Sequence, residues 1–280
     1  MVGLRISNRD VIMKLHWAIQ KNIMRPDRFF AVINACKQLQ YPFVTFRAYP
    51  DYPSKLHIHG FPDLPDIPSD IPVIFCATTF VVRRVYEAKK WFPGVYFDPD
   101  NFTTTAYKEN YNDAFLNADC QVTTLGEFMN AGYDNDETFF IRPVKDLKEF
   151  TGLVVKYQDI AEWDFETDSR DYATPKTEII VSKPQDISKE WRLVVIDEKV
   201  CSGTQYVEDG HLKEDPTLPE KVVSFTEELA KTWSPARVFA LDICELKSGE
   251  IKLLECNCFN CSGLYAADIH KIVKEVSELT

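Results

Sequence analysis

Two carboxylates and one amide near the C-terminal end of the chain have a spacing that predicts a metal site. Asp242 lies in one apolar run, and Glu255 and Asn257 lie in the next. Between the runs, Ser248-Gly249 favours a two-residue hairpin turn, which sets the pairing register. In that register Asp242 faces Glu255, with Cβ atoms about 5 Å apart, and Asn257 lies on the same side. Hard oxygen ligands suit Mg²⁺, which takes few protein ligands together with substrate phosphates.

Two other interpretations of this hairpin stay open from the residues alone. The first is a solvated face, but the usual surface pair is Glu opposite Lys, as the same register places Glu250 and Lys247. Two opposed carboxylates need a proton or a cation between them, and Asp is disfavoured in strands, so the metal interpretation is favoured. The second is a glycosidase acid and base pair, for which directly opposed positions are too close.

Three basic residues are candidates for contacting phosphate beside such a metal, namely Arg142, Lys148 and Arg192. Arg142 ends an apolar run, Lys148 follows it, and Arg192 shares one strand face with Glu190. Basic groups near Mg²⁺ stabilise a phosphoryl group and hold it in line for transfer. Taken singly, each is better explained as an ordinary surface ion pair, and Lys183 is ambiguous in the same way.

Four cysteines on or near the hairpin raise the alternative of a zinc site. Cys256, Cys258 and Cys261 fall within six residues, and Cys244 lies on the same hairpin. The predicted register places Cys244 opposite Leu253 on the carboxylate side, whereas Cys256 points to the other face. The spacing offers no second C-x-x-C or His pair, so buried free thiols are the favoured interpretation.

The N-terminal part of the chain alternates helix and strand signals. Apolar residues four apart predict a helix over Asp10 to Met24, and Pro26 begins a second helix. The further elements predicted are strands at Phe43 to Phe46, Val73 to Cys76 and Val95 to Phe97, and a helix at Thr79 to Trp91. This order is typical of a small α/β domain with a parallel sheet, which we assign to residues 1–117.

Beyond residue 117 the pattern changes to closely spaced strand pairs. Strands are predicted at Thr138 to Ile141, Glu178 to Val181, Trp191 to Ile196, Val200 to Tyr206, Phe239 to Cys244 and Ile251 to Cys256. Helices are predicted at Leu218 to Thr232 and Ala267 to Glu278. The order predicts an α+β domain with antiparallel sheets over residues 118–280.

Composition limits the classes of function. The 280 residues are 45% apolar with a formal net charge of -11, which argues against a nucleic-acid-binding surface. No run approaches the roughly 20 apolar residues of a membrane span, and Met1 to Arg5 lacks the start of a signal peptide. We therefore expect a cytoplasmic protein with reduced thiols. Neither a P-loop nor a G-x-G-x-x-G motif occurs.

Asp242 followed by Leu253 to Asn257 resembles the metal motif of the ATP-grasp superfamily, where an acidic residue and a Glu-x-Asn hold Mg²⁺ against ATP. Other segments resemble an uncharacterised clade of phages and bacteria named for one arginine and two lysines. They are Trp91 to Gly94, Leu116 to Asp119, Phe140 to Gly152, Val181 to Arg192, Gln205-Tyr206 and Asn257 to Tyr265. The resemblance spans Val73 to Asp268, and the first 70 residues match less clearly.

The resemblance implies a pre-ATP-grasp α/β domain followed by two α+β subdomains, at residues 118–183 and 184–280. ATP would lie between the subdomains, with adenine against the backbone of Ile180, Val181, Ser182 and Lys183. Arg142 and Lys148 would reach the phosphates from one side, and Arg192 with Glu190 from the other. Lys183 is a candidate for the second lysine of the clade's name. Asp242, Glu255 and Asn257 would bind Mg²⁺.

The activity implied is that of a ligase that activates a small-molecule or peptide carboxylate as an acyl phosphate and joins it to an amine. A phage origin, and hence the host cytoplasm, fits the clade. One departure is that Tyr157 to Thr174 is acidic and lacks glycine, whereas many ATP-grasp enzymes cover the phosphates with a glycine-rich loop. The alternatives are an ATP-dependent kinase, a non-catalytic nucleotide-binding module and, more distantly, a zinc-binding interaction protein.

Overall fold

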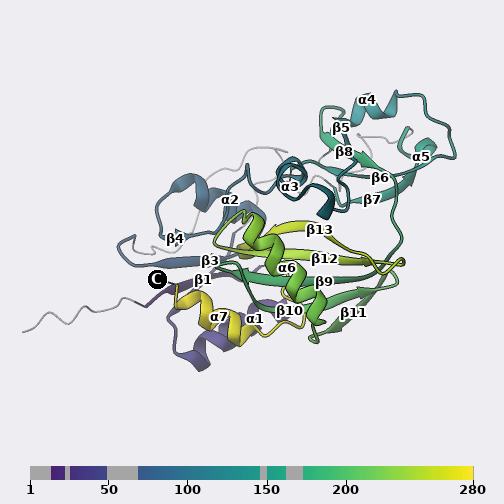
Figure 1. The fold of residues 1–280 in the computed structure, drawn as a ribbon. Coiled ribbons are helices and arrows are strands. Elements are labelled where there is room, and N and C mark those ends of the chain that lie inside the picture. Colours follow the sequence, from purple (N-terminus) through teal and green to yellow (C-terminus); the bar gives the residue numbers. More distant parts are fainter. Residues whose placement is uncertain (1–13, 23–25, 49–68, 146–149, 162–172, 280) are drawn as a thin grey trace, which may run out of the picture.

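The computed structural model describes residues 14–22, 26–48, 69–145, 150–161 and 173–279, and these form three sheets with flanking helices (Figure 1). The N-terminal sheet is parallel, in the order β2-β1-β3-β4. Its strands are β1 (His16–Gln20), β2 (Phe43–Phe46), β3 (Val73–Cys76) and β4 (Pro93–Gly94), and its helices are α1 (Pro26–Leu39) and α2 (Thr79–Ala88). The predicted parallel α/β arrangement is confirmed.

Strand β1 corrects the first helix that the sequence predicts. Within the described part of Asp10 to Met24, His16–Gln20 pair with β2 on one side and β3 on the other. Trp17, Ala18 and Ile19 are at most 1% exposed. A parallel strand that is buried on both faces has a continuous apolar run, and such a run also contains apolar residues four apart.

The central sheet is antiparallel, in the order β11-β10-β9-β12-β13. Its strands are β9 (Ile187–Ile196), β10 (Lys199–Glu208), β11 (His211–Asp215), β12 (Val238–Leu246) and β13 (Ile251–Cys258). The helices near it are α3 (Thr104–Tyr111), α6 (Glu220–Thr232) and α7 (Ile269–Ser277), with the short helices η1 (Asn112–Ala114) and η2 (Phe259–Cys261). Four of the five strands and both later helices match the sequence-based expectations.

The two faces of the central sheet are covered differently. Trp191, Leu193 and Leu241 pack in one cluster with residues of α3 and α6. On the other face, Val194 and Val238 belong to a second cluster that includes residues of α1, α7 and β1. Figure 1 shows α6 on one side of the sheet and α1 with α7 on the other. Side chains of β9 and β12 that lie beyond the cover of α1 and α7 are therefore available for a site.

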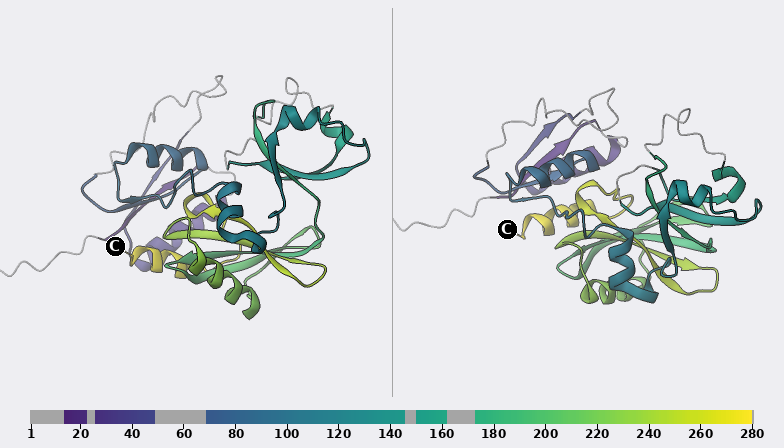
Figure 2. Two further views of the ribbon diagram at one scale, coloured as in Figure 1. Left: turned by 45° about the horizontal axis from the view of Figure 1, so that its top comes forward. Right: turned by 90° about the horizontal axis from the view of Figure 1, so that it is seen from above.

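A smaller antiparallel sheet has the order β5-β8-β6-β7. Its strands are β5 (Gln121–Thr124), β6 (Thr138–Pro143), β7 (Leu153–Lys156) and β8 (Glu178–Ser182), and its helices are α4 (Leu125–Met129) and α5 (Tyr157–Ala161). One of its faces packs on α4 and α5 through Leu125, Phe128 and Ile160. Both views in Figure 2 place this sheet apart from the N-terminal sheet.

Several short elements differ from the prediction. The strand predicted at Val95 to Phe97 lies two residues earlier, at β4, where Pro93 and Gly94 pair with β3. Helices α3, α4 and α5 and strands β5, β7 and β11 are additional elements. Most are four or five residues long, too short to show a clear apolar period.

The overall class matches the prediction of an α/β domain followed by an α+β ATP-grasp fold with antiparallel sheets. Within the described ranges, no helix has the length and apolar character that crossing a bilayer requires.

Candidate functional site

The loop of the β12–β13 hairpin is longer than the sequence predicts. The Leu246 amide donates to the carbonyl of Glu250 at 2.9 Å, and the Gly249 amide donates to the carbonyl of Leu246 at 2.8 Å. Gly249 has a φ of +87°, a backbone conformation that glycine adopts without steric cost. Three residues therefore lie in the loop, and Cys244 pairs with Lys252. The predicted two-residue turn, with its register near the loop, is wrong.

A β-bulge restores the predicted register at the carboxylates. Ile243 pairs with Leu253, but the next pair is Asp242 with Glu255, so Leu254 is an extra residue in β13. Without this bulge Asp242 would face Leu254, because the loop shifts the register by one residue. The opposition of Asp242 and Glu255 is thus as predicted, for a reason that the sequence pattern did not contain.

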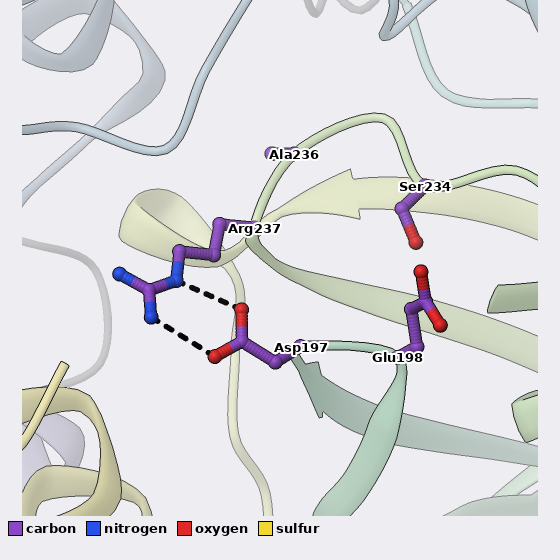
Figure 3. A pocket seen from close by; sticks show the side chains of 5 residues that line it. All are labelled: Asp197, Glu198, Ser234, Ala236 and Arg237. Atoms are coloured by element: carbon purple, nitrogen blue, oxygen red, sulfur yellow. Dashed lines mark hydrogen bonds and ion pairs between the residues drawn. The ribbon is translucent and has the colours of Figure 1, made fainter. Parts of the chain in front are cut away.

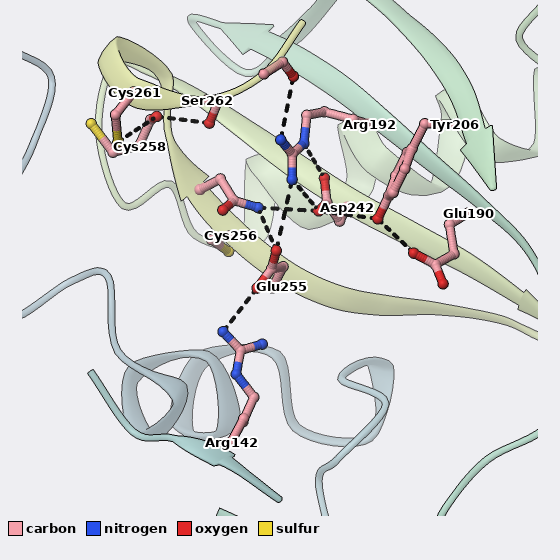
Figure 4. Close-up of polar contacts among 12 residues, drawn as sticks. Arg142, Glu190, Arg192, Tyr206, Asp242, Glu255, Cys256, Cys258, Cys261 and Ser262 are labelled. Carbon is pink, nitrogen blue, oxygen red and sulfur yellow. Dashed lines mark hydrogen bonds and ion pairs between the residues drawn. The ribbon is translucent and has the colours of Figure 1, made fainter. Parts of the chain in front are cut away.

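Arg192 pairs with Asp242 across β9 and β12 (Figure 4). Its Nε donates to Oδ1 at 2.7 Å and its Nη2 to Oδ2 at 2.6 Å. The side chain of Asp242 is 1% exposed and that of Arg192 is 12% exposed. A bidentate pair of this geometry is among the stronger hydrogen-bonded contacts in proteins, so the carboxylate charge is compensated by an arginine.

Arg142 brings the small sheet to the second carboxylate. It lies on β6, and its Nη2 is 2.8 Å from Oε2 of Glu255 on β13. Arg192 Nη2 is 3.7 Å from the other carboxylate oxygen of Glu255. Figure 4 shows the two guanidinium groups approaching Glu255 from different sides. Two arginines from two sheets therefore converge on the carboxylates of the hairpin.

Asn257 shows that the two carboxylates point at one place. Its Nδ2 donates to Oδ2 of Asp242 at 3.2 Å and to Oε1 of Glu255 at 2.9 Å. Oxygen atoms of both carboxylates thus lie within reach of a single atom. No group of three His, Cys, Asp or Glu side chains gathers as a metal site in the described ranges. Two carboxylates and an amide fit a hard cation that shares its coordination with phosphate oxygens.

Burial and pairing act in opposite directions on the charges of this site. Burial raises the pKa of Asp242 to about 6, although the charge and hydrogen bonds of Arg192 oppose the rise. Burial would lower the pKa of Arg192, but Asp242 outweighs it and holds that pKa well above its ordinary value. The two short bonds between them indicate that the pair is ionised, so Asp242 is a carboxylate at neutral pH.

Two tyrosines complete the surroundings of Arg192, and sequence reasoning did not assign them to the site. Tyr206 donates its hydroxyl to Oε2 of Glu190 at 2.6 Å and lies 3.3 Å from Oδ2 of Asp242. Burial raises the pKa of Glu190. The ring of Tyr265 is stacked on that of Tyr206. The predicted β9–β10 hairpin was a signal for Tyr206, because it places the C-terminal end of β10 beside Glu190.

The segment predicted to contact adenine lies at the end of β8. Ile180 and Val181 pair with both β5 and β6 and are at most 7% exposed. The hydroxyl of Ser182 donates to Oδ1 of Asn117 at 2.9 Å. Lys183 follows the strand and is exposed. Lys148, the remaining predicted phosphate contact, lies outside the described residues.

The cysteines of the hairpin point in the directions that the sequence predicts. Cys244 pairs with Glu190 across β9, on the carboxylate face. Cys256 packs in the cluster with α3 and α6. Cys258 Sγ is 3.6 Å from the carbonyl oxygen of Tyr96, and burial raises the thiol pKa of all three cysteines.

Solved structures with the same fold are ATP-grasp ligases. PsnB, determined with a minimal precursor, superposes with a TM-score of 0.55 at 12% identity over 96% of this chain and 99% of its own. The D-cycloserine synthetase DcsG has a TM-score of 0.57 at 11% identity over 94% and 99%. The macrocyclase MdnC of Microcystis aeruginosa MRC, bound to the precursor peptide MdnA, has a TM-score of 0.54 at 11% identity over 95% and 100%. At these identities the likeness shows the fold alone.

The fold and the hairpin site therefore define an ATP-grasp protein. The matching family model is an ATP-grasp domain, family 2 of the clade named for one arginine and two lysines. It covers residues 115–274, which is more than half of the chain. The chain belongs to this family of ATP-grasp domains, and the resemblance predicted from the sequence is confirmed. The predicted enzyme class, an ATP-grasp ligase, is that of the structural neighbours. No curated protein matches the sequence.

Proposed function

We propose that the chain is an ATP-dependent ligase that joins a carboxylate to an amine through an acyl phosphate. The observation that carries the proposal is the convergence of Asp242, Glu255 and Asn257 on one point, with Arg142 and Arg192 beside them. In a chain of an ATP-grasp family, this arrangement has the carboxylates, the amide and the cations that a magnesium nucleotide requires.

In this proposal the nucleotide lies between the small sheet and the central sheet, within residues 118–183 and 184–280. Asp242, Glu255 and Asn257 hold Mg²⁺, and adenine contacts the backbone of residues 180–183. Arg142, Lys148 and Arg192 contact the phosphates, and Glu190 accepts hydrogen bonds from the nucleotide. Support comes from the position of Arg142, which reaches Glu255 from β6 of the opposite sheet.

The residues of the chain act by position and charge. When bound, Mg²⁺ supplies a counter-charge to the phosphate oxygens. Arg192 and Arg142 already lie at the carboxylates, so they need only short movements to reach phosphate. The substrate carboxylate attacks the γ-phosphorus and ADP leaves; the amine then attacks the acyl carbon, and phosphate leaves. Positioning and charge stabilisation suffice, without a covalent protein nucleophile.

The substrate class proposed is a peptide or small-molecule carboxylate with an amine acceptor. The neighbours PsnB and MdnC were solved with precursor peptides, and DcsG is a D-cycloserine synthetase. These proteins support a ligase that accepts either kind of substrate, since all three share the fold of this chain.

The first test measures thermal unfolding with Mg-ATP, with ATP plus EDTA, and with Mg-GTP. Ligand at a hundredfold over its dissociation constant adds about 2.7 kcal/mol to the stability of the native state, which is a shift of several degrees for a chain of this size. We expect a shift that needs magnesium, prefers ATP and is lost in Glu255→Gln.

Glu250→Gln is the matched control, because Glu250 lies on the same hairpin but its side chain is 56% exposed. It should keep the full magnesium-dependent shift. A shift that survives Glu255→Gln unchanged would contradict the metal assignment.

ADP release then separates a ligase from a kinase. Pools of carboxylates and amines are screened together and separately with the purified protein. A ligase forms ADP in a manner that depends on both pools, whereas ADP release with a hydroxyl acceptor alone would indicate phosphotransfer instead.

A further inference from the structure

Asp242 has two roles that compete for the same atoms. Both of its carboxylate oxygens accept hydrogen bonds from Arg192, at 2.7 and 2.6 Å. The proposed function also asks this carboxylate to bind a cation. When an oxygen of Asp242 is taken by the cation, Arg192 loses part of the bidentate pair that now fixes its guanidinium group. Another support must then keep Arg192 in the site.

The structure contains such a support in the stacked rings of Tyr206 and Tyr265. Their centroids are 4.7 Å apart and their planes differ by 12°. The Cζ atom of Arg192 lies 5.6 Å from the centroid of Tyr206 and 5.4 Å from that of Tyr265. Both distances are within the range of about 6 Å over which a cation is attracted to an aromatic ring.

A backbone contact adds to the two rings. Arg192 Nη1 donates to the carbonyl oxygen of Gly263 at 3.3 Å. Gly263 precedes Tyr265 by two residues, so the segment that carries the second ring also binds the guanidinium group directly. Neither the rings nor this carbonyl belongs to the carboxylates that the cation would use.

Local backbone features place both tyrosines. Tyr206 lies where the β9–β10 register shifts, between the pairs of Gln205 and Val207, and a bulge redirects the side chains beside it. Tyr265 has a φ of 46°, which is uncommon for a bulky residue. Such a conformation persists only where the surroundings favour it, and here it accompanies the stacking of one ring on the other.

We propose that Tyr206 and Tyr265 are positioning residues that form an aromatic seat for Arg192, holding its guanidinium group in the site when Asp242 binds the cation. The inference rests on the proposed function and deepens it. The rings do not touch the reacting atoms; they act through the arginine, which is proposed to contact phosphate. The seat matters most when a magnesium nucleotide is bound, because Asp242 alone holds Arg192 well in its absence.

Tyr265→Asn tests the seat, because asparagine tolerates the left-handed backbone and removes the ring. Binding of Mg-AMPPNP is measured by calorimetry, together with the unfolding temperature of the free protein. Loss of one cation–π partner should weaken Mg-AMPPNP binding about tenfold. Tyr265→Phe keeps the ring and should restore binding to within about twofold of the wild type.

The arginine-free background separates a positioning role from a structural one. In Arg192→Ala, Tyr265→Asn should cause no further loss of affinity, since the seat then has nothing to hold. An equal loss in both backgrounds, or no loss with Arg192 present, would overturn the inference. If the wild type itself fails to bind Mg-AMPPNP, the proposed function and this inference both fail. Binding by the wild type that Tyr265→Asn leaves unchanged removes the inference alone.

Discussion

Two arginine–aspartate pairs of the same bidentate form connect β9 and β12. Arg192 binds Asp242 at 2.7 and 2.6 Å in the site. At the other end of the same strand pair, Arg237 binds Asp197 at 2.8 and 3.0 Å, beside a surface pocket (Figure 3). Exposure separates them, since the side chains are 12% and 1% exposed in the first pair but 49% and 52% in the second.

The aspartate pKa values move in opposite directions in the two pairs. Hydrogen bonds from Arg237 lower the pKa of Asp197. Burial raises the pKa of Asp242 to about 6, against the opposing effect of Arg192. Because the partner and the bond geometry are the same, the difference comes from desolvation. A buried pair is expensive to desolvate and contributes little net stability, so we infer that function accounts for Arg192 and Asp242.

The largest effect is expected from breaking the buried pair on one side only. Asp242→Ala leaves the guanidinium group of Arg192 buried with its main partner removed, which should cost about 3–5 kcal/mol of unfolding free energy. Urea denaturation measures this directly as a lower midpoint at an unchanged slope. A loss below about 1 kcal/mol would show that Arg192 finds water or another partner, and that the two pairs are energetically alike.

Replacing both members of the buried pair should sharpen the comparison. Arg192→Met combined with Asp242→Leu removes both charges, so the stability should return to within about 2 kcal/mol of the wild type. The magnesium-dependent thermal shift with ATP should be abolished at the same time. If the double variant is as unstable as Asp242→Ala, the pair is needed for folding, and the functional explanation of its retention is wrong.

The smallest effect is expected at the exposed pair. Asp197→Ala should lower the unfolding free energy by only about 0.2–1 kcal/mol, because solvent and salt screen a pair of this exposure. The pKa of Asp197 is lower in the folded state, so its contribution is present above the unfolded pKa of about 3.9 and is lost as the pH falls through the folded value. The difference between wild type and variant should therefore shrink on acidification from pH 6 towards pH 3. A difference that is constant over this range would show that Asp197 acts through something other than its charge.

The central hairpin shows how far local pattern carries a prediction. Alternation and the turn residues placed β12 and β13 correctly and put Asp242 opposite Glu255. The predicted turn was nevertheless one residue too short, and the bulge at Leu254 cancelled the error. A bulge depends on how the strand meets its neighbours, so an apolar run does not reveal it.

The N-terminal strand shows where local pattern fails. Leu15 and Ile19 have helical spacing, yet β1 lies between β2 and β3, which come from later parts of the chain. The burial of Trp17, Ala18 and Ile19 depends on those neighbours and on α1 and α7. Tertiary packing of this kind overrides the weak local preference of a short segment.

By itself, the sequence determined the order of most elements, the α/β then α+β class, the family resemblance and the opposed carboxylates. These depend on periodicity and short-range turn chemistry, which are local. Only the tertiary structure decided that Arg142 reaches Glu255 from another sheet, that two arginines compensate the carboxylates, and that Tyr265 stacks on Tyr206. Such contacts join residues far apart in the chain, and the burial that makes them strong exists only once the sheets have packed together.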